Sequence, residues 1–188
     1  MAGVEEVLDR ISRAGLLLQQ DKTRDNIVRM LTGETLATSW WNHSQAIQIF
    51  SVLERVTKHP DITRCKLIRG KVTFVHRRLW PSLYTVGSSK EGWQLQMLTE
   101  DERDLLDRIE STGVMANPGA ATKKLEKLIL VHTAQVHSSS GKHITVATSW
   151  DMWAEERVIT RISIEEAKRN LIDATIRLKA LERDLPWT

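Results

Sequence analysis

The sequence predicts an α+β protein of winged-helix-like design, with helices, two short antiparallel β-hairpins and a long C-terminal helix. Alternating apolar and polar residues flank a turn signal twice, at Arg69-Gly70 and at the "SSSG" stretch 138–141. Helical apolar spacing precedes each hairpin. Both halves therefore follow the order helix, short helix, hairpin and further helix, which is the skeleton of this helix-turn-helix variant.

In the first half, predicted to form a winged-helix-like part over 1–90, we expect a helix at 4–20. Its apolar face would carry Val4, Val7, Leu8, Ile11 and Leu18. A short helix should end at Gly33, and the recognition-helix candidate covers 43–57, opened by a capping-box pattern of Asn42 and Gln45. The hairpin follows at 63–76, and its Arg69-Gly70 turn suits a two-residue connection.

After a joint at 88–97, the pattern restarts in a second winged-helix-like part, predicted over 98–188. Thr99 and Glu102 form a capping box, and Gly113 ends the helix that they open. The gap before the second hairpin is short, so one helix of this part should be stunted.

The C-terminal helix is expected to begin at Ser163, with Glu166 completing a capping box. Steps of three and four separate its apolar positions, Ile164, Ala167, Leu171, Ala174, Leu178, Leu181 and Leu185. Such spacing is that of a coiled-coil seam. It predicts a homodimer through 163–185, or alternatively a helix that lies on the chain's own core.

Composition excludes several classes of protein. The chain has 188 residues, 41% hydrophobic and 27% charged, which suits one domain or two small ones. No apolar run approaches the roughly 18 residues that span a bilayer, and residues 1–20 lack a signal-peptide core. One cysteine, Cys65, excludes an internal disulfide and favours a reducing compartment. We therefore expect a cytoplasmic protein without membrane contact.

The net charge of +3 is unevenly distributed along the chain. Residues 58–78 hold seven lysines and arginines against one acid, whereas 99–110 hold six acids against two arginines. Lys66, Arg69 and Lys71, on or beside the first hairpin, are candidates for phosphate contacts. The alternative is a solvated edge, because lysines on edge strands also oppose aggregation.

A second cationic cluster follows that hairpin. His76, Arg77 and Arg78 stand beside Trp80, a combination that suits base stacking together with phosphate binding. The favoured alternative is a strand-to-helix corner with Trp80 buried and the arginines outward.

Three histidines, His132, His137 and His143, fall across the second hairpin. Zinc needs further ligands, and His132 shares the buried parity of its strand, so we predict neither a metal site nor a cofactor.

The tryptophans of the two "ATSW" stretches, 37–40 and 147–150, are expected to anchor the core. We assign this role to Trp40, Trp41, Trp150 and Trp153 and expect Trp93 and Trp187 to be more exposed.

Two blocks, "GKVTFVHRRLWP" at 70–81 and "VHTAQVHSSSGKH" at 131–143, resemble an uncharacterised bacterial family of small winged-helix-like proteins. The resemblance covers roughly residues 16–155. That family is similar to winged-helix proteins linked with DNA, some in alkylation and crosslink repair. Gln19-Gln20-Asp21 is loosely similar to a glutamine-acid motif of such glycosylases, but the resemblance assigns no catalytic residue.

Together these patterns predict a non-enzymatic DNA-binding protein, in regulation or in support of repair. The helix at 43–57 and the hairpin at 63–76 would form its contact face. One alternative is an enzyme that holds an extruded damaged base among Trp40, Trp41 and His76, which requires a pocket with a carboxylate or glutamine in reach. Another is a protein-interaction module that uses the heptad helix and an acidic face.

Overall fold

The chain folds into two units, each built around a small antiparallel sheet of three strands. The computed structural model describes residues 2–137 and 143–188. One unit contains residues up to Trp80 together with Asn170–Pro186, and the other contains Pro81–Arg169. The predicted α+β class is confirmed. The predicted parts were 1–90 and 98–188. The main difference is that Asn170–Pro186, which was predicted in the second part, belongs to the first unit.

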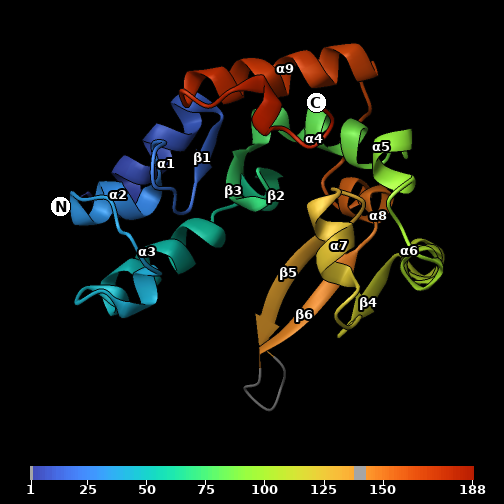
Figure 1. Cartoon of the computed structure of the whole chain (residues 1–188), viewed down its shortest axis with the longest axis horizontal. Helices are drawn as coiled ribbons and strands as arrows, with labels where there is room; N and C mark the ends of the chain where they lie inside the picture. Colours follow the sequence, from blue (N-terminus) through green and yellow to red (C-terminus); the bar gives the residue numbers. More distant parts are fainter. Residues whose placement is uncertain (1, 138–142) are drawn as a thin grey trace. The chain divides into compact units, whose positions relative to one another are not determined.

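The first unit has the order helix, strand, helix, helix, strand, strand (Figure 1). Its elements are α1 (Val4–Ala14), β1 (Leu16–Leu18), α2 (Ile27–Thr32), a 3-10 turn η1 (Trp40–Asn42), α3 (Ala46–Thr57), β2 (Ile62–Ile68) and β3 (Lys71–His76). Strand β3 is central and pairs antiparallel with both β1 and β2. Helix α1 packs against β1, β3 and α3, and α3 packs against β2.

The first helix is shorter than predicted, because Gly15 ends it. Gly15 has φ 89°, a left-handed conformation, and its N–H donates to Ile11 O at 2.7 Å. The chain then extends, and Leu16–Leu18 become fully buried in strand β1. The prediction that Leu18 belongs to the helix was therefore wrong.

The predicted β2–β3 hairpin is confirmed. Arg69 and Gly70 have φ of 52° and 64°, as a two-residue hairpin turn with two left-handed residues requires. Helix α3, in contrast, begins at Ala46 and not at 43. Gln45 makes no side-chain cap, and η1 takes the place of the expected capping box.

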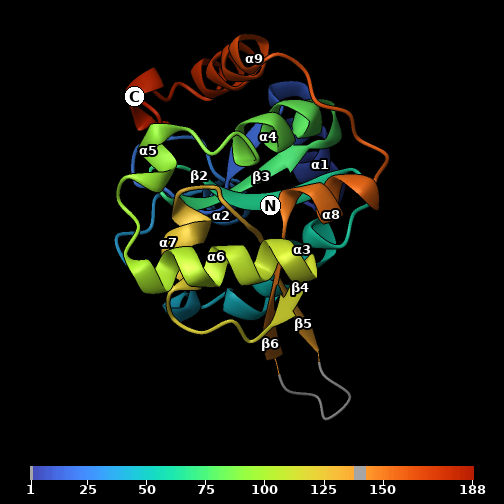
Figure 2. The ribbon, with the colours of Figure 1, turned by 90° about the vertical axis from the view of Figure 1, so that its right-hand side faces the viewer.

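The second unit repeats the strand order of the first. After α4 (Trp80–Gly87) and α5 (Gly92–Leu95) come α6 (Glu100–Thr112), β4 (Val114–Ala116), α7 (Thr122–Lys127), β5 (His132–His137), β6 (His143–Thr148) and α8 (Trp150–Glu155). The central strand β6 pairs with β4 and β5. Figure 2 shows α6 beside α7, and a single short helix lies between β4 and β5, as the short gap predicted. The loop expected at 138–141 lies outside the described residues.

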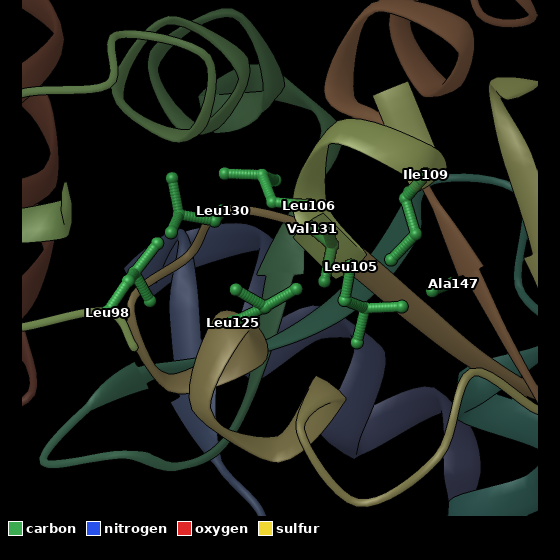
Figure 3. Close-up of a cluster of buried hydrophobic side chains, with 8 residues drawn as sticks. All are labelled: Leu98, Leu105, Leu106, Ile109, Leu125, Leu130, Val131 and Ala147. Carbon is green, nitrogen blue, oxygen red and sulfur yellow. The ribbon is translucent and has the colours of Figure 1, made fainter. Parts of the chain in front are cut away.

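The core of the second unit gathers apolar side chains from its helices and sheet (Figure 3). Leu105, Leu106 and Ile109 come from α6, Leu125 comes from α7 and Ala147 from β6. The predicted capping box at the start of α6 is confirmed, because Thr99 Oγ1 accepts from Glu102 N at 3.3 Å and Thr99 N donates back to Glu102 at 2.9 Å.

The C-terminal helix α9 (Ile164–Arg177) is shorter than the seam suggested. Lys179 takes a left-handed φ of 58°, and a 3-10 turn η3 (Glu182–Asp184) follows. The seam residues Ala167, Leu171, Ala174 and Leu178 are fully buried within the single chain. These four positions are therefore buried as the alternative of a helix on the chain's own core requires, whereas Leu181 is 47% exposed, and the homodimer stays a prediction. Among the described residues, no helix has both the length and the apolar character that a bilayer span needs.

Candidate nucleic-acid interface

The tip of the β2–β3 hairpin is tied to the chain's own carboxylates. Lys71 Nζ lies 2.5 Å from Asp21 Oδ2. Arg69 N donates to the backbone oxygen of Asp184 at 2.8 Å, and its Nε lies 3.9 Å from Asp184 Oδ1. The Arg69 side chain nevertheless stays 54% exposed. Of these two predicted contact residues, Arg69 still faces solvent, whereas Lys71 is committed to an internal ion pair. The third, Lys66, is half-buried on β2.

Asp21 is the centre of this ionic network, with its side chain only 2% exposed. Its Oδ1 accepts from Thr23 N at 2.8 Å and from Arg24 N at 3.0 Å. Burial opposes ionisation of this carboxyl, but the bonds from Lys71, Thr23 and Arg24 outweigh it and hold the pKa of Asp21 well below its usual value. Arg24 continues the network through a 2.5 Å bond to Asp184 Oδ2. Segments far apart in the sequence are thereby fixed around the hairpin turn.

The second predicted cluster lies at the opposite end of β3. His76 N donates to Gly15 O at 2.9 Å there. Trp80 is buried, with Nε1 donating to Val75 O at 3.2 Å, while Arg77 and Arg78 are exposed. This is the strand-to-helix corner that the sequence favoured.

The charges of the corner also have partners within the protein. Arg77 pairs with Asp61 at 3.1 Å, and Arg78 donates to Arg13 O at 2.8 Å. Burial, reinforced by the charge of Arg78, lowers the pKa of His76. The exposed Arg77–Asp61 pair is of the kind that contributes little to stability, so a phosphate could replace the carboxylate.

A pocket of about 460 Å³ lies beside the hairpin turn. Three segments line it, namely 19–22, 36–39 and 70–72. Gln20 holds the middle segment, because its Nε2 donates to Thr38 O at 2.7 Å and its Oε1 accepts from Trp40 N at 3.4 Å. Within the part of the chain that the structure describes, the side-chain amide of Gln19 makes no hydrogen bond, so it is free to meet a ligand, and the exposed Lys22 also lines the pocket.

An aromatic stack stands next to this pocket. The rings of Trp40 and Trp41 are stacked with centroids 3.9 Å apart, and Trp41 lies 5.6 Å from the ring of Phe50 on α3. Trp40 is buried as predicted, but Trp41 is 60% exposed, so its assignment to the core was wrong. Trp40 and Trp41 are adjacent in the turn η1, and Trp40 occupies the core position while Trp41 stacks on its ring from the solvent side.

The structure does not assemble the base site expected from Trp40, Trp41 and His76. The strands β1 and β3 run antiparallel, so Gln19 meets Val72 while His76 meets Gly15 at the other end. Trp40 is attached to the Gln20 end. The side chains that accompany the tryptophans are therefore those of the Gln19–Asp21 segment, which the sequence had marked only through a loose motif.

In the second unit, His132 is buried between Trp150 and Trp153, at ring-centroid distances of 5.9 and 5.6 Å. This agrees with the interpretation of His132 as a packed residue. His137 pairs with His143 in the β5–β6 register, and their side chains lie outside the described part. Among the residues that the structure describes, no group of three potential metal ligands comes together.

The second unit also contains a polar cluster that the sequence analysis missed. Asp151 accepts from Tyr84 Oη and from Arg161, each at 2.8 Å, and the guanidinium lies 5.0 Å from the centre of the Tyr84 ring. Burial and the Asp151 carboxylate raise the pKa of Tyr84. A pocket of about 310 Å³ adjoins the cluster, and Lys90 and Glu110 pair across its lining at 2.6 Å. Its charges therefore neutralise one another. These residues are distant in sequence, so no local motif marks them.

No protein-family model matches the chain, and comparisons with curated proteins and with solved structures also find no match.

Proposed function

We propose that the protein binds DNA through its first unit, folded as a winged helix. The observation that carries this proposal is the order α1, β1, α2, α3, β2, β3 with strand order β1-β3-β2. In this arrangement α3 stands where a recognition helix stands, and the β2–β3 hairpin is the wing. The second unit has the same strand order with a single short helix before its hairpin, which supports a related but reduced module.

The ionic contacts refine which cations face DNA. Lys71 fixes the wing through Asp21, so its role in this proposal is structural. Lys22 lines the pocket, Arg69 precedes the lining residue Gly70 at the turn, and both side chains are exposed. They are the cations best placed for phosphates. In this proposal Arg77 and Arg78, at the other end of β3, contribute less to the DNA affinity.

Two matched double variants test this assignment. Lys22→Ala with Arg69→Ala should weaken binding to random duplex DNA and make the dependence of log K on log salt less steep by about two units, one for each cation. Arg77→Ala with Arg78→Ala removes the same charge at the other end of β3 and should change the slope less. Equal effects of the two pairs would contradict the assignment of the face.

A second candidate function, release of a damaged base, is favoured by the pocket. It places an unpaired amide, Gln19, on the lining of a pocket, and such a site requires a carboxylate or a glutamine in reach. In the reaction, water would add to the sugar carbon while the base departs with the electrons of the glycosidic bond and takes up a proton. Gln19 would orient the water or the base.

Base-release assays on alkylated duplexes test this second candidate. Wild-type protein should liberate free base, and Gln19→Ala should abolish release while retaining DNA binding. Absence of released base from a wild-type protein that binds the same duplex would leave binding as the function and exclude the enzyme.

A further inference from the structure

Three large apolar side chains form an exposed patch at the start of α3. Trp41 is 60% exposed, Ile47 88% and Phe50 41%. Ile47 and Phe50 are neighbours three positions apart on one helix face, and Phe50 contacts Trp41 at 5.6 Å between ring centroids. The patch is therefore continuous. Apolar groups gathered on a surface in this way mark an interaction site more often than scattered ones do.

The patch is held rigidly by the pocket beside it. Trp41 stacks on Trp40, which is only 5% exposed, with an angle of 26° between the rings. The backbone of Trp40 is in turn attached to Gln20, whose amide also holds the pocket loop at Thr38. The flat face of Trp41 is thus presented next to the pocket by groups that are already fixed, so binding a planar partner would cost little ordering.

The charges around the patch indicate which partner it suits. Residues 35–53 contain no aspartate, glutamate, lysine or arginine, so the patch itself is uncharged. Glu54 lies on the same helix face as Ile47 and Phe50, and Lys58 offsets its charge at 2.7 Å. The exposed Arg55 on α3 and Lys22 at the pocket add positive charge to the unit. An uncharged, aromatic surface on a unit with exposed cations is complementary to bases carried on a phosphate backbone.

We infer that Trp41, with Phe50 and Ile47, stacks on bases that have left the duplex stack, so that the protein selects DNA containing unpaired bases. Aromatic rings bind any base face, and an isoleucine can enter a base step as an apolar wedge. A fully paired duplex keeps its base faces covered and offers the patch only its backbone. This inference rests on the proposed DNA binding by the first unit and adds the class of DNA that is preferred.

The test compares one duplex in three forms: fully paired, with a single-base bulge, and as the separate strand. Wild-type protein should bind the bulged and single-stranded forms about tenfold more tightly than the paired form. Trp41→Ala and Ile47→Ala should lower the affinity for the bulged and single-stranded forms more than the affinity for the paired form, and so remove most of this preference. Trp41→Phe should retain much of it, because a ring remains. Val158→Ala, at a residue 92% exposed in the second unit, is the matched control and should change nothing.

The outcomes separate this inference from the function on which it rests. If wild-type protein binds none of the three DNAs at low salt, both are overturned. If it binds them equally, or if the patch variants keep the preference, only the stacking inference is overturned. Two other results would also overturn the stacking inference, provided that the DNA preference does not depend on Trp41. If Trp41 is needed for binding to vesicles of anionic phospholipid, the patch binds a membrane. If it is needed for self-association in sedimentation, the patch binds a second copy of the chain. Because Ile47 is 88% exposed, its variant should fold, and its thermal unfolding can be checked directly.

Discussion

Replacing Asp21 with Asn tests whether the ionic network holds the wing. The change keeps the shape of the side chain. Its remaining oxygen can still accept from Thr23 N and Arg24 N, which lie 2.8 and 3.0 Å from Asp21 Oδ1 in the wild type. What is lost is the 2.5 Å ion pair with Lys71. Breaking a buried pair costs about 3–5 kcal/mol when the remaining charge stays buried. Lys71 is 39% exposed and can be hydrated, so we expect a loss of about 2–3 kcal/mol.

Urea unfolding at neutral pH measures this loss, and Asp25→Asn is the matched control. Asp25 pairs with Arg10 at 2.7 Å, with the two side chains 38% and 33% exposed. Removing such an exposed pair should cost less than about 1 kcal/mol. If the two variants lose the same free energy of unfolding, the Asp21 pair does not anchor the wing in the way inferred here.

The pH dependence gives an independent check. Because the pKa of Asp21 is lower in the folded state, its stabilisation is complete above the unfolded-state pKa of about 3.9 and is lost as pH falls below that value toward the folded-state pKa. The wild-type free energy of unfolding should therefore decrease below about pH 4 more steeply than that of Asp21→Asn. Parallel curves for the two proteins would contradict a lowered pKa.

Two further substitutions probe packing and the C-terminal anchor. Gly87→Ala would place a Cβ 2.3 Å from Trp150 Nε1, so we expect a loss of at least about 1–3 kcal/mol in thermal unfolding. Gly3→Ala, which meets no atom within 4 Å, is its control, and equal melting temperatures of the two variants would count against the packing described. Asp184→Asn should cost about 3–5 kcal/mol in urea unfolding, because Arg24 is only 11% exposed and loses its 2.5 Å partner. A loss below about 1 kcal/mol would mean that the Arg24–Asp184 bond does not hold the C-terminal segment after α9 in place.

Local turn and capping chemistry made several elements predictable. Arg69-Gly70 demanded a tight hairpin turn, and the Thr99 and Glu102 pair placed the start of α6. In both cases the signal lies within a few residues, and the structure satisfies it through bonds inside the same segment. The α+β class followed from these signals together with apolar periodicity.

Elements that depend on distant partners were not predictable in this way. Leu16–Leu18 continue the helical spacing of α1, and only their pairing with β3 makes them a strand. Gly15 was the one local signal of that break. The end of α9 was missed for a similar reason, because the apolar spacing runs on past the left-handed Lys179.

The candidate site was only partly accessible from the sequence. The basic hairpin was visible as a run of charge, but the carboxylates that meet it, Asp21 and Asp184, lie far from it in the chain. Charge counts within one segment cannot reveal such partners. The exposure of Trp41 was hidden as well, since Trp40 and Trp41 are adjacent and only their packing decides which ring is buried.

The most direct test of the account is a titration of the purified protein with random duplex DNA across a series of salt concentrations. Binding through cations of the first unit predicts measurable affinity at low salt and a linear fall of log K as log salt rises. An absence of binding at low salt, or an affinity indifferent to salt, would contradict the proposal that this unit engages the DNA backbone.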